Sequence, residues 1–169
     1  MNSKQNSTGI DETDGYIPKP VHVNTYSVVI PISPVAQGRG SINAKGKFPR
    51  IYDPKKSREF KNKIKEYLLD SGIPTYQKHL PVTLSVECYV KRPLAHYTKN
   101  GAKTKLWKQF PTAKPDVSNY AKGIEDALIG IVLHDDAQIV DLIAKKRYAT
   151  IGTLPYLVIS VYLNLNVEA

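Results

Sequence analysis

The alternation of apolar and polar residues predicts four β-strands. Residues 25–32 (TYSVVIPI) are β-branched and apolar, which favours a first strand that ends near two prolines. Residues 82–90 (VTLSVECYV) alternate cleanly and predict a second strand with one apolar face. Residues 138–149 and 155–165 predict two more strands near the end of the sequence.

Two segments carry apolar residues at helical spacing. The first begins at Asp53-Pro54, where aspartate is a good N-cap and proline suits the first helical position, and Gly72 ends it. The second covers residues 117–129 and begins behind Asp116. The expected buried faces are Phe60, Ile64, Tyr67 and Leu68 in the first helix, and Val117, Ala121, Ile124 and Leu128 in the second.

The order of these elements predicts an α+β fold with a small mixed β-sheet packed against two helices. Residues 1–23 are mostly polar and aperiodic, so we expect a flexible N-terminal arm before a single domain at 24–169. The glycine-rich, basic stretch 35–52 predicts a mobile loop or ribbon that faces a ligand.

Basic residues are segregated along the chain, whose net charge is +9. Residues 45–65 hold nine Lys or Arg against two acids, and residues 91–115 hold seven with no acid, so the rest of the chain is net negative. Segregated positive charge favours a polyanion such as nucleic acid, although a merely soluble basic surface is the alternative. The candidate phosphate contacts are Arg39, Lys45, Lys47, Arg50, Lys55, Lys56, Arg58, Lys91, Arg92, Lys114, Lys145 and Lys146.

Aromatic residues lie among these basic residues, and one cysteine lies in the second strand. His96, Tyr97 and Trp107 suit stacking on unpaired bases, although a core role is equally open for Trp107. The lone Cys88 has no disulfide partner and suits a small buried hydrophobe. No apolar run approaches a membrane span or a secretory signal, so we expect a cytoplasmic protein.

Residues 114–142 (KPDVSNYAKGIEDALIGIVLHDDAQIVDL) carry the candidate chemistry. Asp116 lies at the start of the second helix, and Asp135 and Asp136 follow its end. Carboxylates on short loops in a basic surface suit Mg²⁺, with Mn²⁺ as a second possibility. Because that helix is about 20 Å long, either the Asp135-Asp136 turn folds back to Asp116 or another subunit completes the site.

Each acid also has a structural explanation. Asp116 could act only as an N-cap, and the aspartate pair could be an exposed turn. Asp126, four residues after Lys122, could form an intrahelical ion pair.

The combination KPD-x-x-N-x-x-K at 114–122, DAL at 126–128 and DDAQIV at 135–140 resembles the RusA family of Holliday junction resolvases, common in phages and prophages. The resemblance covers most of residues 25–165. It implies a homodimeric, magnesium-dependent endonuclease of a bacterial host cytoplasm that nicks four-way DNA junctions symmetrically, in recombination and repair. It also implies that Asp116 and Asp136 hold the metal and that Lys122 lies near the scissile phosphate. Asp135 is the first residue of the Asp135-Asp136 pair and a further candidate metal ligand.

Ser118 departs from the family pattern, which has a second acid at this position. A hydroxyl is a weaker magnesium ligand than a carboxylate, so Ser118 predicts weaker metal binding. The alternatives are therefore an active nuclease or a branched-DNA-binding protein with weak or no catalysis. A basic RNA-binding protein is a third reading, but it gives no reason for acids at both ends of one helix.

Overall fold

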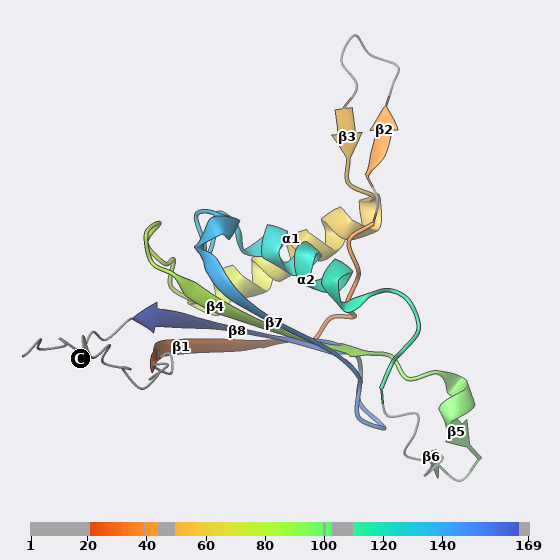
Figure 1. Cartoon of the computed structure of the whole chain (residues 1–169). Helices are drawn as coiled ribbons and strands as arrows, with labels where there is room; N and C mark the ends of the chain where they lie inside the picture. Colours follow the sequence, from red (N-terminus) through yellow and green to blue (C-terminus); the bar gives the residue numbers. More distant parts are fainter. Residues whose placement is uncertain (1–20, 39, 44–49, 100, 103–109, 166–169) are drawn as a thin grey trace, which may run out of the picture.

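A four-stranded mixed sheet forms the centre of the computed structural model, which describes residues 21–38, 40–43, 50–99, 101–102 and 110–165 (Figure 1). Its strands are β1 (Val21–Ile30), β8 (Tyr156–Leu165), β4 (Val82–Val90) and β7 (Ile139–Tyr148), in the order β1-β8-β4-β7. β8 runs antiparallel to β1 and β4, whereas β4 and β7 are parallel. The predicted α+β class with a mixed sheet and two helices is confirmed.

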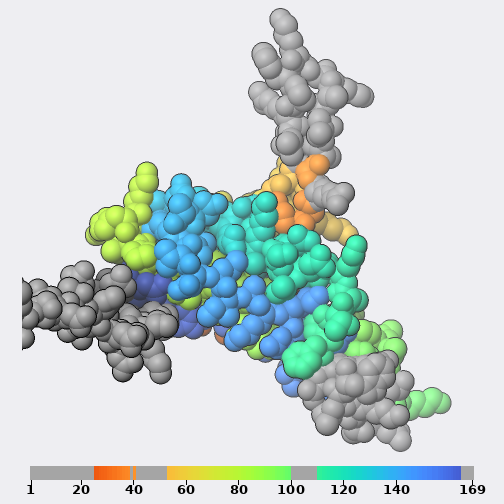
Figure 2. Space-filling model, viewed as in Figure 1, coloured from red at the N-terminus to blue at the C-terminus, as the bar shows by residue number. Residues whose placement is uncertain are grey.

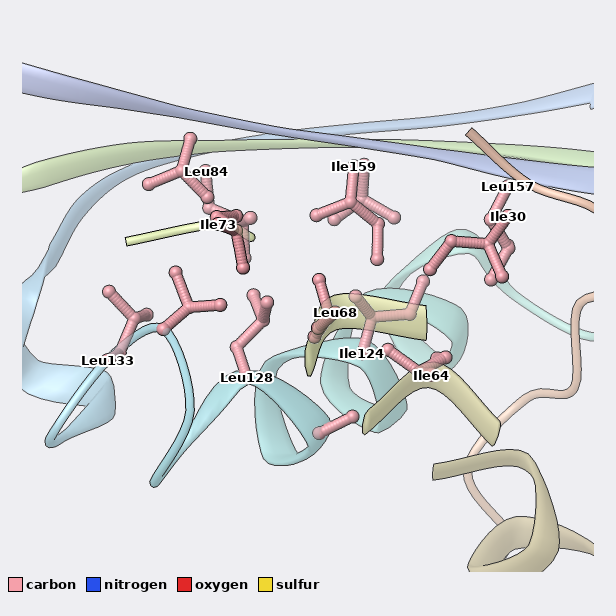
Figure 3. Packing of buried hydrophobic residues seen from close by; sticks show 14 of the residues in the cluster. Ile30, Ile64, Leu68, Ile73, Leu84, Ile124, Leu128, Leu133, Leu157 and Ile159 are labelled. Atoms are coloured by element: carbon pink, nitrogen blue, oxygen red, sulfur yellow. The ribbon is translucent and has the colours of Figure 1, made fainter. Parts of the chain in front are cut away.

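Two helices, α1 (Lys55–Asp70) and α2 (Val117–Leu128), cover one face of this sheet (Figure 1). Alternate residues of β4 and β8 point toward them, and Figure 3 shows the apolar side chains that fill the space between sheet and helices. Cys88 lies in this core, and burial raises the pKa of its thiol to about 12. The core therefore fixes α2 over β4 and β7.

Smaller elements extend from this body. β2 (Ser41–Asn43) and β3 (Arg50–Tyr52) pair as an antiparallel ribbon that projects away from the sheet in Figure 1, as the glycine-rich stretch suggested. The short helix η1 (Leu94–His96) is followed along the chain by β5 (Tyr97–Thr98) and β6 (Gly101–Ala102). These two strands pair antiparallel, which the sequence did not predict. Neither described α-helix has the length and apolar character needed to cross a membrane.

Three local predictions were wrong. β1 begins at Val21, so residues 21–23 pair with β8, and the rest of the predicted arm lies outside the described residues. Asp53 is not the N-cap of α1, because Pro54 occupies that position and the Asp53 carboxylate binds side chains elsewhere. Tyr67 is 38% exposed and lies at the edge of the buried face of α1.

Candidate active site

Asp116 occupies the N-cap position of α2 without acting as a cap. Its backbone is extended, and its side chain makes no capping hydrogen bond. The carboxylate is exposed at the positive end of the helix dipole, which favours a negative charge there. The explanation of Asp116 as a capping residue therefore fails, because within the part of the chain that the structure describes its side chain accepts no bond from the helix N–H groups.

Lys146 of β7 fixes the segment that leads into Asp116. Its Nζ donates to the carbonyl oxygens of Ala113 and Pro115, at 2.8 and 2.7 Å. These two bonds hold the end of β7 against the start of α2. Lys146 was predicted as a phosphate contact, and the structure gives its ammonium group this positioning role.

The Asp135-Asp136 turn lies at the other end of α2. Asp135 precedes the short helix η3 (Asp136–Gln138), and its carboxylate accepts a hydrogen bond from the Ala137 N–H at 2.9 Å. This bond lowers the pKa of Asp135, and a side-chain hydrogen bond with Asp136 and the positive charge of Lys78 lower it further. Asp136 is exposed, and its side chain shares a hydrogen bond with that of Asp135.

Gln138 holds this turn in place from within the protein. Its side chain is 5% exposed, and its Oε1 accepts from the N–H groups of His134 and Asp135, at 2.8 and 3.3 Å. Its Nε2 donates to the carbonyl oxygens of Gln77 and Leu80, at 2.9 and 3.2 Å. A pocket of about 450 Å³ lies between these two segments, lined in part by Lys78, His79 and Asp135.

Asp116 and Asp136 lie at opposite ends of α2 within one chain, Asp116 at its N-cap and Asp136 in the short helix η3 that follows it. β4, α2 and β7 form a β-α-β unit, in which the helix runs opposite to the two parallel strands. Asp116 precedes α2 near the end of β7, and Asp136 precedes the start of β7. The 12 residues of α2 span about 18 Å, so the turn does not fold back to the helix start.

A polar stripe on α2 lies between the two ends. Ser118, Lys122 and Glu125 are spaced four and three residues apart, which puts them on one side of the helix. Burial raises the pKa of the Glu125 carboxyl, the charges of Asp126 and Asp136 raise it further, and Lys122 opposes them. Sequence reasoning missed Glu125, because its proximity to Asp136 depends on the turn that follows the helix.

An ion-pair network joins α1, α2 and the segment before α1. Lys61 of α1 pairs with Asp53 and, at 3.3 Å, with Asp126 of α2. The predicted pair of Asp126 with Lys122 is therefore wrong. Gln37 donates to Asp53 at 3.0 Å, and its backbone N–H donates to the carbonyl oxygen of Asn119 at 2.8 Å. The network fixes the base of the β2–β3 ribbon beside the first turn of α2.

The predicted basic contacts fall on several surfaces. Lys55, Lys56 and Arg58 are exposed on α1, and Lys114 is exposed beside Asp116. Arg92 stacks over the Tyr148 ring at 5.0 Å, and Lys145 pairs with Glu87 at 2.8 Å on the sheet face away from the helices. Lys91 is exposed, and Arg50 lies in β3. Arg39, Lys45, Lys47 and Trp107 lie outside the described residues.

The described part of one chain holds no group of three or more His, Cys, Asp or Glu side chains arranged to bind a metal. It offers carboxylates at two places instead, Asp116 at one end of α2 and Asp136 at the other. Magnesium usually takes one or two protein carboxylates and completes its shell with waters and phosphate oxygens. The donor chemistry thus fits magnesium, but one chain does not assemble a closed site.

Comparison with known proteins identifies the family of this chain. The model of the family described as "Endodeoxyribonuclease RusA" matches residues 31–161, which include α2 and the Asp135-Asp136 turn. The chain is also similar to the "Uncharacterized protein YqaN" of Bacillus subtilis (strain 168), with 36% identity over 118 residues, 69% of this chain and 82% of that protein. The family match covers most of the chain and confirms the resemblance carried by residues 114–140. The chain belongs to the RusA family of endodeoxyribonucleases.

Proposed function

We propose that this protein is a magnesium-dependent endonuclease that binds four-way DNA junctions and nicks them symmetrically, in recombination and repair of bacterial or prophage DNA. The family match supports nuclease activity on branched DNA. The single observation that carries the proposal is the uncapped, exposed carboxylate of Asp116 at the start of α2. An aspartate that served only the fold would use its oxygens on the helix N–H groups.

Asp116 and Asp136 would hold the metal, because their carboxylates are exposed and free of capping bonds. Asp135 has one oxygen engaged by Ala137 and would contribute mainly negative charge. Ser118 lies in the first turn of α2, where its hydroxyl would hold a metal-bound water. Magnesium, or manganese in its place, supplies polarisation of the phosphate and activation of an attacking water.

Lys122 would lie beside the scissile phosphate. Its ammonium group is exposed on the polar stripe of α2, between the two acidic ends. There it would offset the negative charge that develops on the phosphate oxygens during attack. Asn119 supports the same turn through its backbone carbonyl, which accepts from Gln37.

The exposed lysines and arginine of α1, together with Lys114, would hold the DNA backbone near this helix. Phosphate contacts of this kind give affinity that falls steeply with salt and does not depend on sequence. A four-way junction has two-fold symmetry and needs two nicks, so we expect a homodimer.

The test is nicking of a labelled four-way junction by Asp116→Asn, with Asp70→Asn as the matched control at the end of α1. The neutral amide keeps the shape of Asp116 but removes a charged metal ligand. We expect a rate loss of about 100-fold or more in Asp116→Asn, with junction binding retained, and no change in the control. Metal-dependent nicking by Asp116→Asn at the wild-type rate would overturn the assignment.

Ser118 favours a second candidate, a junction-binding protein without catalysis. The substitution Ser118→Asp discriminates between the two. In an active nuclease, it should lower the magnesium concentration needed for half-maximal nicking. In a binding protein, it should create magnesium-dependent nicking where the wild type has none. No change in either quantity would place residue 118 outside the metal site.

A further inference from the structure

Large apolar side chains are exposed at one end of the sheet, beside the start of α2. Phe110 is 55% exposed, Leu94 of η1 is 83% exposed, and Leu154 in the turn between β7 and β8 is 82% exposed. Figure 1 shows that this turn and the β5–β6 hairpin lie at the same end as the segment that leads into α2. Exposed apolar side chains that share one part of a surface indicate a binding site there.

The two segments that form this end carry positive charge and no negative charge. Residues 91–115 and residues 142–165 contain no Asp or Glu, and both contain several Lys or Arg. A surface that is basic and apolar suits nucleic acid, because the cations bind phosphates while apolar side chains meet the bases. The partner that fits this end is therefore DNA whose bases are accessible.

Phe110 is held in a defined position at this end. Its ring lies against the Arg147 guanidinium, whose Cζ is 4.8 Å from the ring centroid. Pro111, the next residue, is buried, and Lys146 then binds two carbonyl oxygens of residues 113–115. Figure 2 shows the teal segment that begins at residue 110 against the blue of β7. The exposed ring is thus carried by a segment that is anchored to β7.

Phe110 lies close to the candidate active site. Lys146 and Arg147 are neighbours in β7, so their side chains point to opposite faces of the sheet, and the segment from Phe110 to Asp116 crosses the strand edge between them. Six residues span at most about 20 Å. Stacked nucleotides of one strand are about 3.4 Å apart, so the ring lies within a few nucleotides of a phosphate held at Asp116.

The other described aromatic residues of the basic segment contact the fold more closely. The His96 ring packs edge-on against Tyr148, with centroids 5.1 Å apart, and Arg92 lies over the same Tyr148 ring. Tyr97 is partly buried. Among the described residues of 91–113, Phe110 therefore offers the most exposed aromatic ring.

We propose that Phe110 stacks on a base that is unpaired at the branch point of the junction, within a few nucleotides of the nicked phosphate. The proposal rests on the proposed nuclease function and identifies a contact that favours branched DNA. Arg147 covers one face of the ring, and the base would cover the other. Bases inside a duplex already stack on their neighbours, so a duplex offers no such face.

The experiment combines Phe110→Ala with junctions that lack one base beside the branch point, each position in turn. Binding is measured in a chelator, so that it is read separately from nicking. Loss of the contacted base should weaken wild-type binding about 10-fold, as should Phe110→Ala on the intact junction. The two changes together should cost no more than either alone. Independent, multiplying losses at every position would overturn the proposal.

Two further substitutions separate stacking from apolar packing. Phe110→Trp keeps an aromatic face and should bind as the wild type does, whereas Phe110→Leu should bind as weakly as Phe110→Ala. Binding of Phe110→Leu at the wild-type level would overturn stacking. Val29→Ala is the surface control, since Val29 is 60% exposed on β1, and it should leave binding unchanged.

An unbranched duplex of the same length shows which hypothesis fails. All variants should bind it equally, which also shows that they are folded, and a loss of duplex binding in Phe110→Ala equal to its loss on the junction would overturn the proposal. Metal-dependent nicking of the junction with no effect of Phe110→Ala on binding overturns the stacking contact alone. A wild type that neither nicks the junction nor prefers it to the duplex overturns the proposed function as well.

Discussion

Replacement of Gln138 by methionine should destabilise the fold and loosen the Asp135-Asp136 turn. Methionine has nearly the same volume, so the substitution removes four hydrogen bonds while the space stays filled. The lost partners are the N–H groups of His134 and Asp135 and the carbonyl oxygens of Gln77 and Leu80. Because Gln138 is buried, these backbone groups lose a partner that water replaces only in part.

The magnitude follows from those four bonds. Two are short, at 2.8 and 2.9 Å, and two are longer, at 3.2 and 3.3 Å. Each buried bond contributes on the order of 1 kcal/mol, and the longer ones contribute less. We therefore expect the free energy of unfolding to fall by about 2–4 kcal/mol.

Urea unfolding followed by circular dichroism measures this change, with Gln77→Met as the control. The Gln77 side chain is exposed, and only its carbonyl oxygen takes part in the bonds described. The control should change stability by less than about 0.5 kcal/mol. A similarly small change in Gln138→Met would refute the view that this residue fixes the turn.

Three further predictions concern stability and reactivity. Gly123→Ala should stabilise the protein by about 0.5–1 kcal/mol in urea unfolding, because alanine favours the helix. Its Cβ would meet Gln37 only at ordinary contact distances of 3.5 Å or more. A loss of stability would show that the space beside Gln37 cannot take a methyl group. Hydrogen bonds from Lys145 and then Tyr89 lower the pKa of Glu87 below 4.5, so Glu87 stabilises the fold above pH 4.5 and loses that effect as the pH falls through its lowered pKa. Lys145→Met should flatten this acid dependence of the unfolding free energy, and an unchanged profile would refute the assignment. Cys88, with its pKa of about 12, should resist a thiol reagent at pH 8 until urea unfolds the protein; rapid reaction of the folded protein would show that the core opens.

The elements that depend on local pattern could be predicted from the sequence. β4 matched its alternating segment, and α2 matched its helical spacing within one residue. The structure also confirmed the end of α1 at Gly72, whose φ of +68° suits glycine. In each case, the residues that decide the element are neighbours along the chain.

Features that depend on contacts between distant segments could not be predicted. Asp53 looked like a helix cap, but Lys61 and Gln37 bind its carboxylate once the chain folds. Asp126 likewise pairs with Lys61 on another helix and not with Lys122. The acids of the site could be named from their motif, but their separation depends on the parallel pairing of β4 with β7.

The most direct test of the central claim is a nicking assay on a four-way junction in which each strand is labelled in turn. The wild-type protein would be incubated with the junction in magnesium, in manganese and in a chelator. We predict nicks in two opposing strands at symmetric positions, with either metal and not with the chelator. Tight binding of the junction with no nick at any concentration of either metal would contradict this prediction.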